Sequence, residues 1–88
     1  MRIWLVIENT PGYLPETDPM PFWTRKEAES YARSLKEELR DLGYKVYGSA
    51  KRGYYYAQLH ENDLGRVIEI VKCEDPKIIA QYLDLLEE

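Results

Sequence analysis

The chain has 88 residues and a mass of 10.4 kDa, so we expect residues 1–88 to form a single domain without room for a second. Hydrophobic residues make up 44% and charged residues 32%, with a mean hydropathy of -0.57, which excludes a disordered or membrane-embedded chain. Twelve Lys and Arg residues against sixteen Asp and Glu residues give a net charge of -4, which makes nucleic acid an improbable partner.

The targeting and redox signals are those of a cytoplasmic protein. The longest apolar run extends from Ile3 to Ile7 and is far shorter than the roughly 18 residues of a membrane span. We expect no membrane association, no secretory leader and a cytoplasmic location. The one cysteine, Cys73, has no partner for an internal disulfide, which is consistent with a reducing compartment.

The first two segments are a strand and a proline-rich loop. Residues Arg2 to Glu8 are apolar at both alternating sets of positions, a pattern typical of a central strand. Residues Asn9 to Trp23 contain four prolines and one glycine, so we predict a fifteen-residue loop. Loops of this length are uncommon in compact domains and are often functional.

A helix is predicted after this loop. Thr24 and Glu27 have the Thr-x-x-Glu spacing that caps a first helical turn. The apolar residues from Ala28 to Leu42 follow at intervals of three and four, which predicts one buried helix face. Gly43 is placed to take the left-handed conformation that ends the helix.

Three β-rich segments and a second helix complete the chain. The strands are predicted at Tyr44 to Ala50, Tyr54 to Leu59 and Arg66 to Lys72, with connections short enough for hairpins. Asp75 and Pro76 provide the cap and first position of the last helix. The predicted fold is α+β, in the order β-α-β-β-β-α, with a mixed, mainly antiparallel four-stranded sheet and two helices.

The strands carry more apolar side chains than one sheet face accommodates. The face opposite the main core is expected to contain some combination of Trp4, Val6, Tyr47, Tyr54, Tyr56, Val67 and Val71. Two explanations remain open. Either the two helices cover one face each, or a second subunit or a ligand covers the second face.

The residue types that usually carry out catalysis are sparse. His60 is the single histidine, and no sequence pattern joins it to Cys73 as a metal site or a nucleophile pair. We predict no metal, no cofactor and no enzymatic activity.

Tyrosine and basic residues in the second half of the chain suggest a ligand site as one alternative function. The rings of Tyr47, Tyr54 and Tyr56 would stack a nucleotide-derived ligand, and cations would hold its phosphate. These cations are Lys51, Arg52 and Arg66. The competing explanation is that a tyrosine-rich strand packs as tyrosines do in any sheet.

Two motifs carry a resemblance to a known group of proteins. Thr10 to Glu16 reads TPGYLPE and Asp63 to Glu69 reads DLGRVIE, and in this order they resemble small uncharacterised proteins of actinobacterial phages. The resemblance implies a phage accessory protein, made in the bacterial host, that binds a host protein such as a defence component.

The partner-binding surface is predicted around the proline-rich loop. It consists of Tyr13, Leu14 and Trp23, together with Trp4 of the first strand. A homodimer or a larger assembly of the chain is also compatible with its excess of apolar strand surface.

Overall fold

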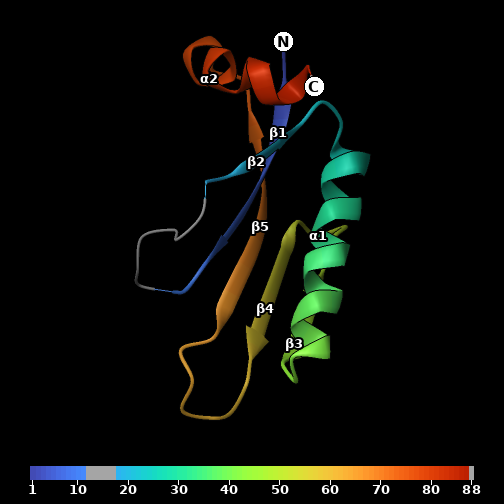
Figure 1. Ribbon diagram of the computed structural model, residues 1–88, viewed down its shortest axis with the longest axis vertical. Helices are drawn as coiled ribbons and strands as arrows, with labels where there is room; N and C mark the ends of the chain where they lie inside the picture. Colours follow the sequence, from blue (N-terminus) through green and yellow to red (C-terminus); the bar gives the residue numbers. More distant parts are fainter. Residues whose placement is uncertain (12–17, 88) are drawn as a thin grey trace.

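The computed structural model describes residues 1–11 and 18–87, which form one sheet and two helices (Figure 1). The strands are β1 (Ile3–Asn9), β2 (Met20–Phe22), β3 (Lys45–Ser49), β4 (Tyr54–Gln58) and β5 (Arg66–Cys73). The helices are α1 (Arg25–Asp41) and α2 (Pro76–Leu86). The strand order is β2-β1-β5-β4-β3, and every neighbouring pair is antiparallel.

The predicted α+β class with two helices is confirmed. The predicted mixed, mainly antiparallel sheet of four strands is wrong, because the sheet has five strands and all of its pairs are antiparallel. The additional strand is β2, which lies inside the segment predicted to be a loop. Its Pro21 lies opposite Leu5 of β1. The strand is at the edge of the sheet, where the missing amide hydrogen of proline takes no bond away from a second neighbouring strand.

Helix α1 begins and ends where the sequence predicts. The Thr24 hydroxyl accepts a hydrogen bond from the Glu27 backbone amide at 3.2 Å and donates one to the Glu27 carboxylate at 2.9 Å. In a capping box the Glu27 carboxylate would accept a hydrogen bond from a backbone amide, but here it accepts one from the Thr24 hydroxyl. At the other end of α1, Gly43 has φ of 98°. This left-handed conformation ends the helix, as the sequence predicts.

Helix α1 covers one face of the sheet along most of its length (Figure 1). The small side chains of Ala28 and Ala32 face the strands and let the helix approach closely. The buried core between α1 and the sheet consists of Val6, Ala28, Ala32, Leu39, Ala50, Tyr55, Ala57 and Ile68. This face is therefore closed by the chain itself.

Helix α2 covers only one end of the opposite face. Asp75 caps it by accepting a hydrogen bond from the Lys77 amide at 2.9 Å, as the sequence predicts. Its buried Ile79 packs in a second cluster with Ile3, Leu5 and Cys73. Figure 1 shows α2 crossing the upper end of the sheet, away from β3 and β4. The opposite face is thus neither fully covered nor fully open.

Neither α1 nor α2, the helices of the described part of the chain, has both the length and the apolar character that a membrane span requires.

Candidate partner-binding surfaces

Trp4 and Trp23, predicted to share one partner surface, lie in different surroundings. Trp4 is half-buried on the sheet face that α1 covers, and the guanidinium carbon of Arg25 lies 5.4 Å from its ring centroid. Trp23 follows β2 and is 40% exposed. Tyr13 and Leu14 lie outside the described residues. Trp4 therefore belongs to the helix-covered layer, and Trp23 is the exposed one of the two tryptophans.

Trp23 borders a hollow between β2, the start of α1 and the end of α2. We name it the Trp23 hollow. Its volume is about 180 Å³, and its lining consists of Met20, Pro21, Phe22, Trp23, Glu27, Leu85 and Leu86. Three of the large apolar residues that line it, Met20, Trp23 and Leu85, are also between 40% and 51% exposed. Exposed apolar side chains gathered around a concave surface are typical of interaction sites.

A hydrogen bond from the Trp23 indole fixes the two walls of this hollow. Its Nε1 donates to the Leu86 carbonyl oxygen at 3.2 Å. That carbonyl is among the last of α2, which find no partner within the helix. The bond therefore ties the end of α2 to the segment between β2 and α1.

A second open surface lies on the sheet face opposite α1. We name it the tyrosine face, after Tyr47, Tyr54 and Tyr56. Tyr47 and Tyr56 are paired across β3 and β4, and Tyr54 lies two residues from Tyr56 on the same face. Tyr47 is 58% exposed and Tyr54 is 44% exposed, whereas the intervening Tyr55 is buried under α1. The structure therefore brings the three predicted tyrosines together.

The ring of Tyr56 is held in place by the turn before β5. Gly65 has φ of +82°, and a Cβ on it would lie 2.9 Å from the Tyr56 hydroxyl oxygen. The Tyr56 hydroxyl donates a long hydrogen bond of 3.5 Å to the Leu64 carbonyl oxygen. A glycine is needed here because the backbone is left-handed and approaches the ring closely.

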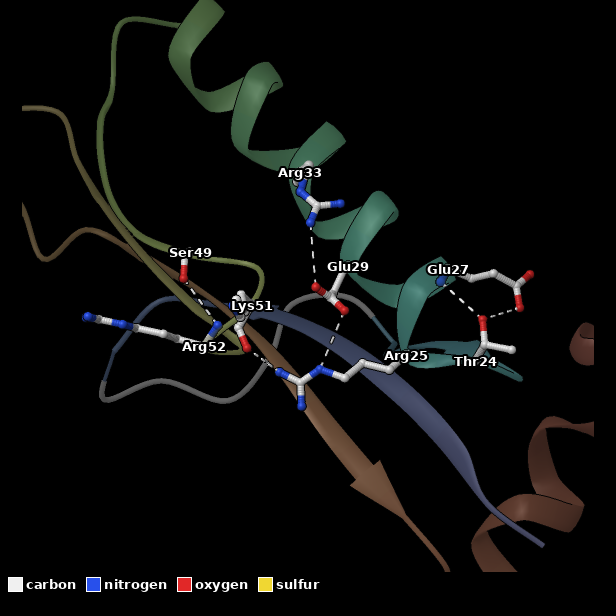
Figure 2. Close-up of polar contacts among 8 residues, drawn as sticks. All are labelled: Thr24, Arg25, Glu27, Glu29, Arg33, Ser49, Lys51 and Arg52. Atoms are coloured by element: carbon white, nitrogen blue, oxygen red, sulfur yellow. Dashed lines mark hydrogen bonds and ion pairs between the residues drawn. The ribbon is translucent and has the colours of Figure 1, made fainter.

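The cations predicted to bind a phosphate do not gather around the tyrosines. Lys51 and Arg52 lie in the turn between β3 and β4, and both are exposed. Figure 2 shows that this turn is held by other residues. Nη2 of Arg25 donates to the Lys51 carbonyl oxygen at 2.6 Å, and the Ser49 hydroxyl accepts from the Arg52 amide at 3.2 Å. The Arg52 side chain points away from these contacts.

Arg66 lies on the opposite side of the sheet from the tyrosines. It is paired with Ala57, a residue of the core beneath α1. Its Nη1 forms an ion pair with Glu8 Oε1 at 2.8 Å. Both side chains line a hollow of about 210 Å³ near the C-terminal end of α1, together with apolar residues such as Leu35. The six residues predicted for the ligand site therefore do not form one site.

A third hollow lies at one end of the tyrosine face, around Lys45 and Tyr47, and we name it the Lys45 hollow. Its volume is about 380 Å³, and it is lined by Lys45, Tyr47, Gln58, Leu59, His60 and Glu61. The Gln58 amide nitrogen donates to the carbonyl oxygens of Glu61 and Asp63, at 3.2 and 3.1 Å. These bonds order the turn that forms one wall. Of the predicted ligand residues, the hollow contains Tyr47 alone.

Asp63 stabilises the same turn through its carboxylate. Oδ2 accepts a hydrogen bond from the Leu59 amide at 3.0 Å. This bond and a second one from the Gly65 backbone lower the pKa of Asp63 below its usual value, because they favour the charged form. The carboxylate is therefore ionised at neutral pH and serves to hold the turn.

His60 and Cys73, the residues considered for nucleophilic or metal chemistry, are far apart. His60 is exposed in the turn before β5, whereas Cys73 is buried beside α2 at the other end of that strand (Figure 1). Within residues 1–11 and 18–87, no group of three or more His, Cys, Asp or Glu side chains is arranged to hold a metal ion.

No protein-family model matches the chain, and no similar protein was found among curated sequences or solved structures. The resemblance to phage proteins therefore stays a prediction.

Sequence reasoning missed several residues that shape these surfaces. Met20 lies in the segment predicted to be a loop, and Leu85 lies in the predicted last helix. Arg25 was not singled out because its contacts with Trp4 and Lys51 join segments distant in sequence. The Trp23 hollow joins residues near Trp23 to Leu85 and Leu86, which are distant in sequence, so its lining comes together only in the folded chain.

Proposed function

We propose that the protein is a non-enzymatic phage-type accessory protein that binds a host protein, such as a defence component. In this proposal an apolar side chain of the partner enters the Trp23 hollow. The observation that supports it is the gathering of Met20, Trp23 and Leu85 around a concave surface while all three remain open to solvent. Large apolar residues around a pocket are the usual anchors of protein interfaces.

The size of the Trp23 hollow favours a protein partner over a small molecule. Its volume of about 180 Å³ is smaller than the roughly 300–1,000 Å³ of typical ligand pockets. A single leucine, methionine or phenylalanine side chain is the occupant that suits such a space. The neighbouring surface would then be covered by the rest of the partner.

Two substitutions on α2 test this proposal. Leu85→Glu places a charge in the hollow, and Ile78→Glu places the same charge on an exposed position of α2 outside it. Proteins captured from host lysate by the wild type are identified by mass spectrometry, and the purified partner is then titrated by calorimetry. We expect Leu85→Glu to weaken binding at least about 30-fold, as loss of an interface anchor does, and Ile78→Glu to bind as the wild type.

Failure to capture any partner specifically, or equal affinity of the partner for both variants, contradicts the proposal. Circular dichroism and thermal unfolding establish that each variant is folded before binding is compared.

A nucleotide-derived ligand in the Lys45 hollow is the second candidate. The volume of about 380 Å³ lies within the usual range for ligand sites, and Tyr47 and Lys45 provide a stacking ring and a cation. Thermal shift with a panel of nucleotides, together with native mass spectrometry of freshly purified protein, tests it. Stabilisation that Tyr47→Ala abolishes is the expected result, and absence of both a shift and a bound mass contradicts it.

A further inference from the structure

The tyrosine face is an aromatic surface that the two helices do not cover. Tyr47 and Tyr54 are exposed on it and Tyr56 is half-buried, whereas Val67, which pairs with Tyr56, is buried. Helix α1 lies on the other side of the sheet, and α2 packs on the end that contains Ile3, Leu5 and Cys73. Tyrosine is enriched where proteins meet, because its ring is apolar and its hydroxyl tolerates water. The charged residues on this face indicate what covers it.

Two charges of opposite sign lie symmetrically about Tyr56. Lys45 on β3 is diagonal to Tyr56 in one strand direction, since it pairs with Gln58. Glu69 on β5 is diagonal to Tyr56 in the other direction, since it pairs with Tyr54. With strands ~4.8 Å apart and ~3.4 Å between residues, each diagonal is ~8 Å. The register therefore places Tyr56 midway between a cation and an anion.

Neither charge is neutralised within the described part of the chain. No ion pair there involves Lys45 or Glu69. Lys45 is exposed, and Glu69 is half-buried. A half-buried carboxylate on an aromatic face gains most from a partner that supplies a cation at the same position.

This arrangement is self-complementary under two-fold rotation. Consider an axis that lies between two facing copies, passes over Tyr56 and is perpendicular to the line from Lys45 to Glu69. Rotation about it places each Lys45 opposite the Glu69 of the other copy. The same rotation brings Tyr56 against its symmetry mate and Tyr47 close to Tyr54 of the other copy. In an interface with two-fold symmetry, if Lys45 of one copy contacts Glu69 of the other, then Glu69 of the first copy contacts Lys45 of the second.

The edges of the sheet suit association less well than the face does. The β2 edge contains Pro21, which cannot donate to an added strand. The β3 edge contains Gly48 with φ of 100°, which lies outside the range of a regular strand. Packing of two faces, with no strand added at an edge, is therefore the favoured mode.

We infer that a second copy of this chain covers the tyrosine face, in a two-fold dimer held by two Lys45–Glu69 ion pairs around a tyrosine cluster. The inference goes beyond the proposed function, because the Trp23 hollow lies toward the opposite edge of the sheet and stays open in the dimer. The dimer would cover Lys45 and Tyr47, so it competes with the second candidate function.

The expected area sets the expected affinity. Three strands by about five residues make a plane of ~250 Å² for each copy. This is the size of a small, transient interface. The dimer should therefore be weak and dissociate at high micromolar concentration.

Sedimentation velocity at protein concentrations from about 5 to about 500 µM tests the inference, because this range spans the expected dissociation constant. The wild type is expected to convert from monomer to dimer over this range. Glu69→Lys and Lys45→Glu each replace attraction by repulsion in both pairs, so each should raise the dissociation constant at least about tenfold. The double variant restores both pairs in reverse and should return to within about threefold of the wild type.

Matched charge changes on α1 control for net charge. Lys26→Glu and Glu38→Lys lie on exposed positions of that helix, on the other side of the sheet, and should leave dimerisation unchanged. Tyr56→Ala should also weaken the dimer at least about tenfold, since it removes the ring at the centre of the interface. Trp23→Ala should have no effect on dimerisation.

Three results would overturn the inference: a wild type that stays monomeric throughout, single reversals that leave the dissociation constant unchanged, or a double variant no better than either single. Rescue by the double variant also separates loss of pairing from loss of folding, because misfolding from one substitution is not repaired by the other.

Discussion

The contacts of Arg25 lead to a quantitative prediction about stability. This side chain joins the start of α1 to the β3–β4 turn through the 2.6 Å hydrogen bond to the Lys51 carbonyl oxygen (Figure 2). Hydrogen bonds of charged donors contribute about 1.5–3 kcal/mol, and cation–π contacts such as that with Trp4 about 0.5–1 kcal/mol. The Arg25 side chain is 40% exposed, so its ion pair with Glu29 adds little to stability. We expect Arg25→Ala to reduce the free energy of unfolding by about 2 kcal/mol.

Arg25→Lys separates the charge of this residue from its shape. Lysine keeps the positive charge but lacks the planar fork that reaches Lys51 and Glu29 together, so we expect a loss of about 1 kcal/mol. Both variants are measured by urea unfolding, with attention to the denaturant slope, because an unchanged slope means that the same surface is exposed. A loss below about 0.5 kcal/mol for Arg25→Ala, or wild-type stability for Arg25→Lys, would refute the assignment of Arg25 as the connection.

Three further predictions concern the turns and α2. Gly65→Ala should destabilise by about 3 kcal/mol, because its backbone is left-handed and its Cβ would meet the Ala57 carbonyl oxygen at 2.5 Å. Gly43→Ala, also left-handed but with its nearest atom at 3.7 Å, should cost only about 1 kcal/mol, and similar losses in urea unfolding would argue against the crowding. The lowered pKa of Asp63 adds stability above the unfolded pKa of about 3.9, and this is lost as the pH falls through the lower folded pKa. Melting temperatures from pH 2 to 7 should therefore fall less steeply at the acid end for Asp63→Asn than for the wild type, and parallel curves would contradict this. Ile79→Ala should cost about 2–4 kcal/mol in urea unfolding, since Ile79 is 2% exposed, while Ile78→Ala, 38% exposed, should cost under about 1 kcal/mol; equal costs would mean that α2 is not docked as described.

The helices were predictable because their signals are local. Thr24, Asp75 and Gly43 mark helix ends by their own chemistry, and each occupies the predicted position. Strand β2 was not predictable in this way. Its Pro21 argues against a strand, and only the position at the sheet edge makes this proline acceptable.

The face on which each strand residue lies was harder to predict than the strand itself. Tyr54, Tyr55 and Tyr56 are identical in type, so the sequence does not reveal that Tyr55 is buried and its neighbours open. The face of Arg66 likewise depends on the register of β5 against β4, which places it opposite Ala57. The sequence thus identified the tyrosines of the open face, but joined to them a cation that belongs to the other side.

The position of β1 has a consequence for how the chain folds as it is synthesised. This strand comes first in sequence, yet its long neighbour is β5, with Ile3 opposite Cys73. At about 5–20 residues per second on the ribosome, several seconds pass between the emergence of the two strands. During that interval one flank of an apolar strand has no hydrogen-bonding neighbour, and a nascent chain halted before residue 73 lacks the last part of its central pairing.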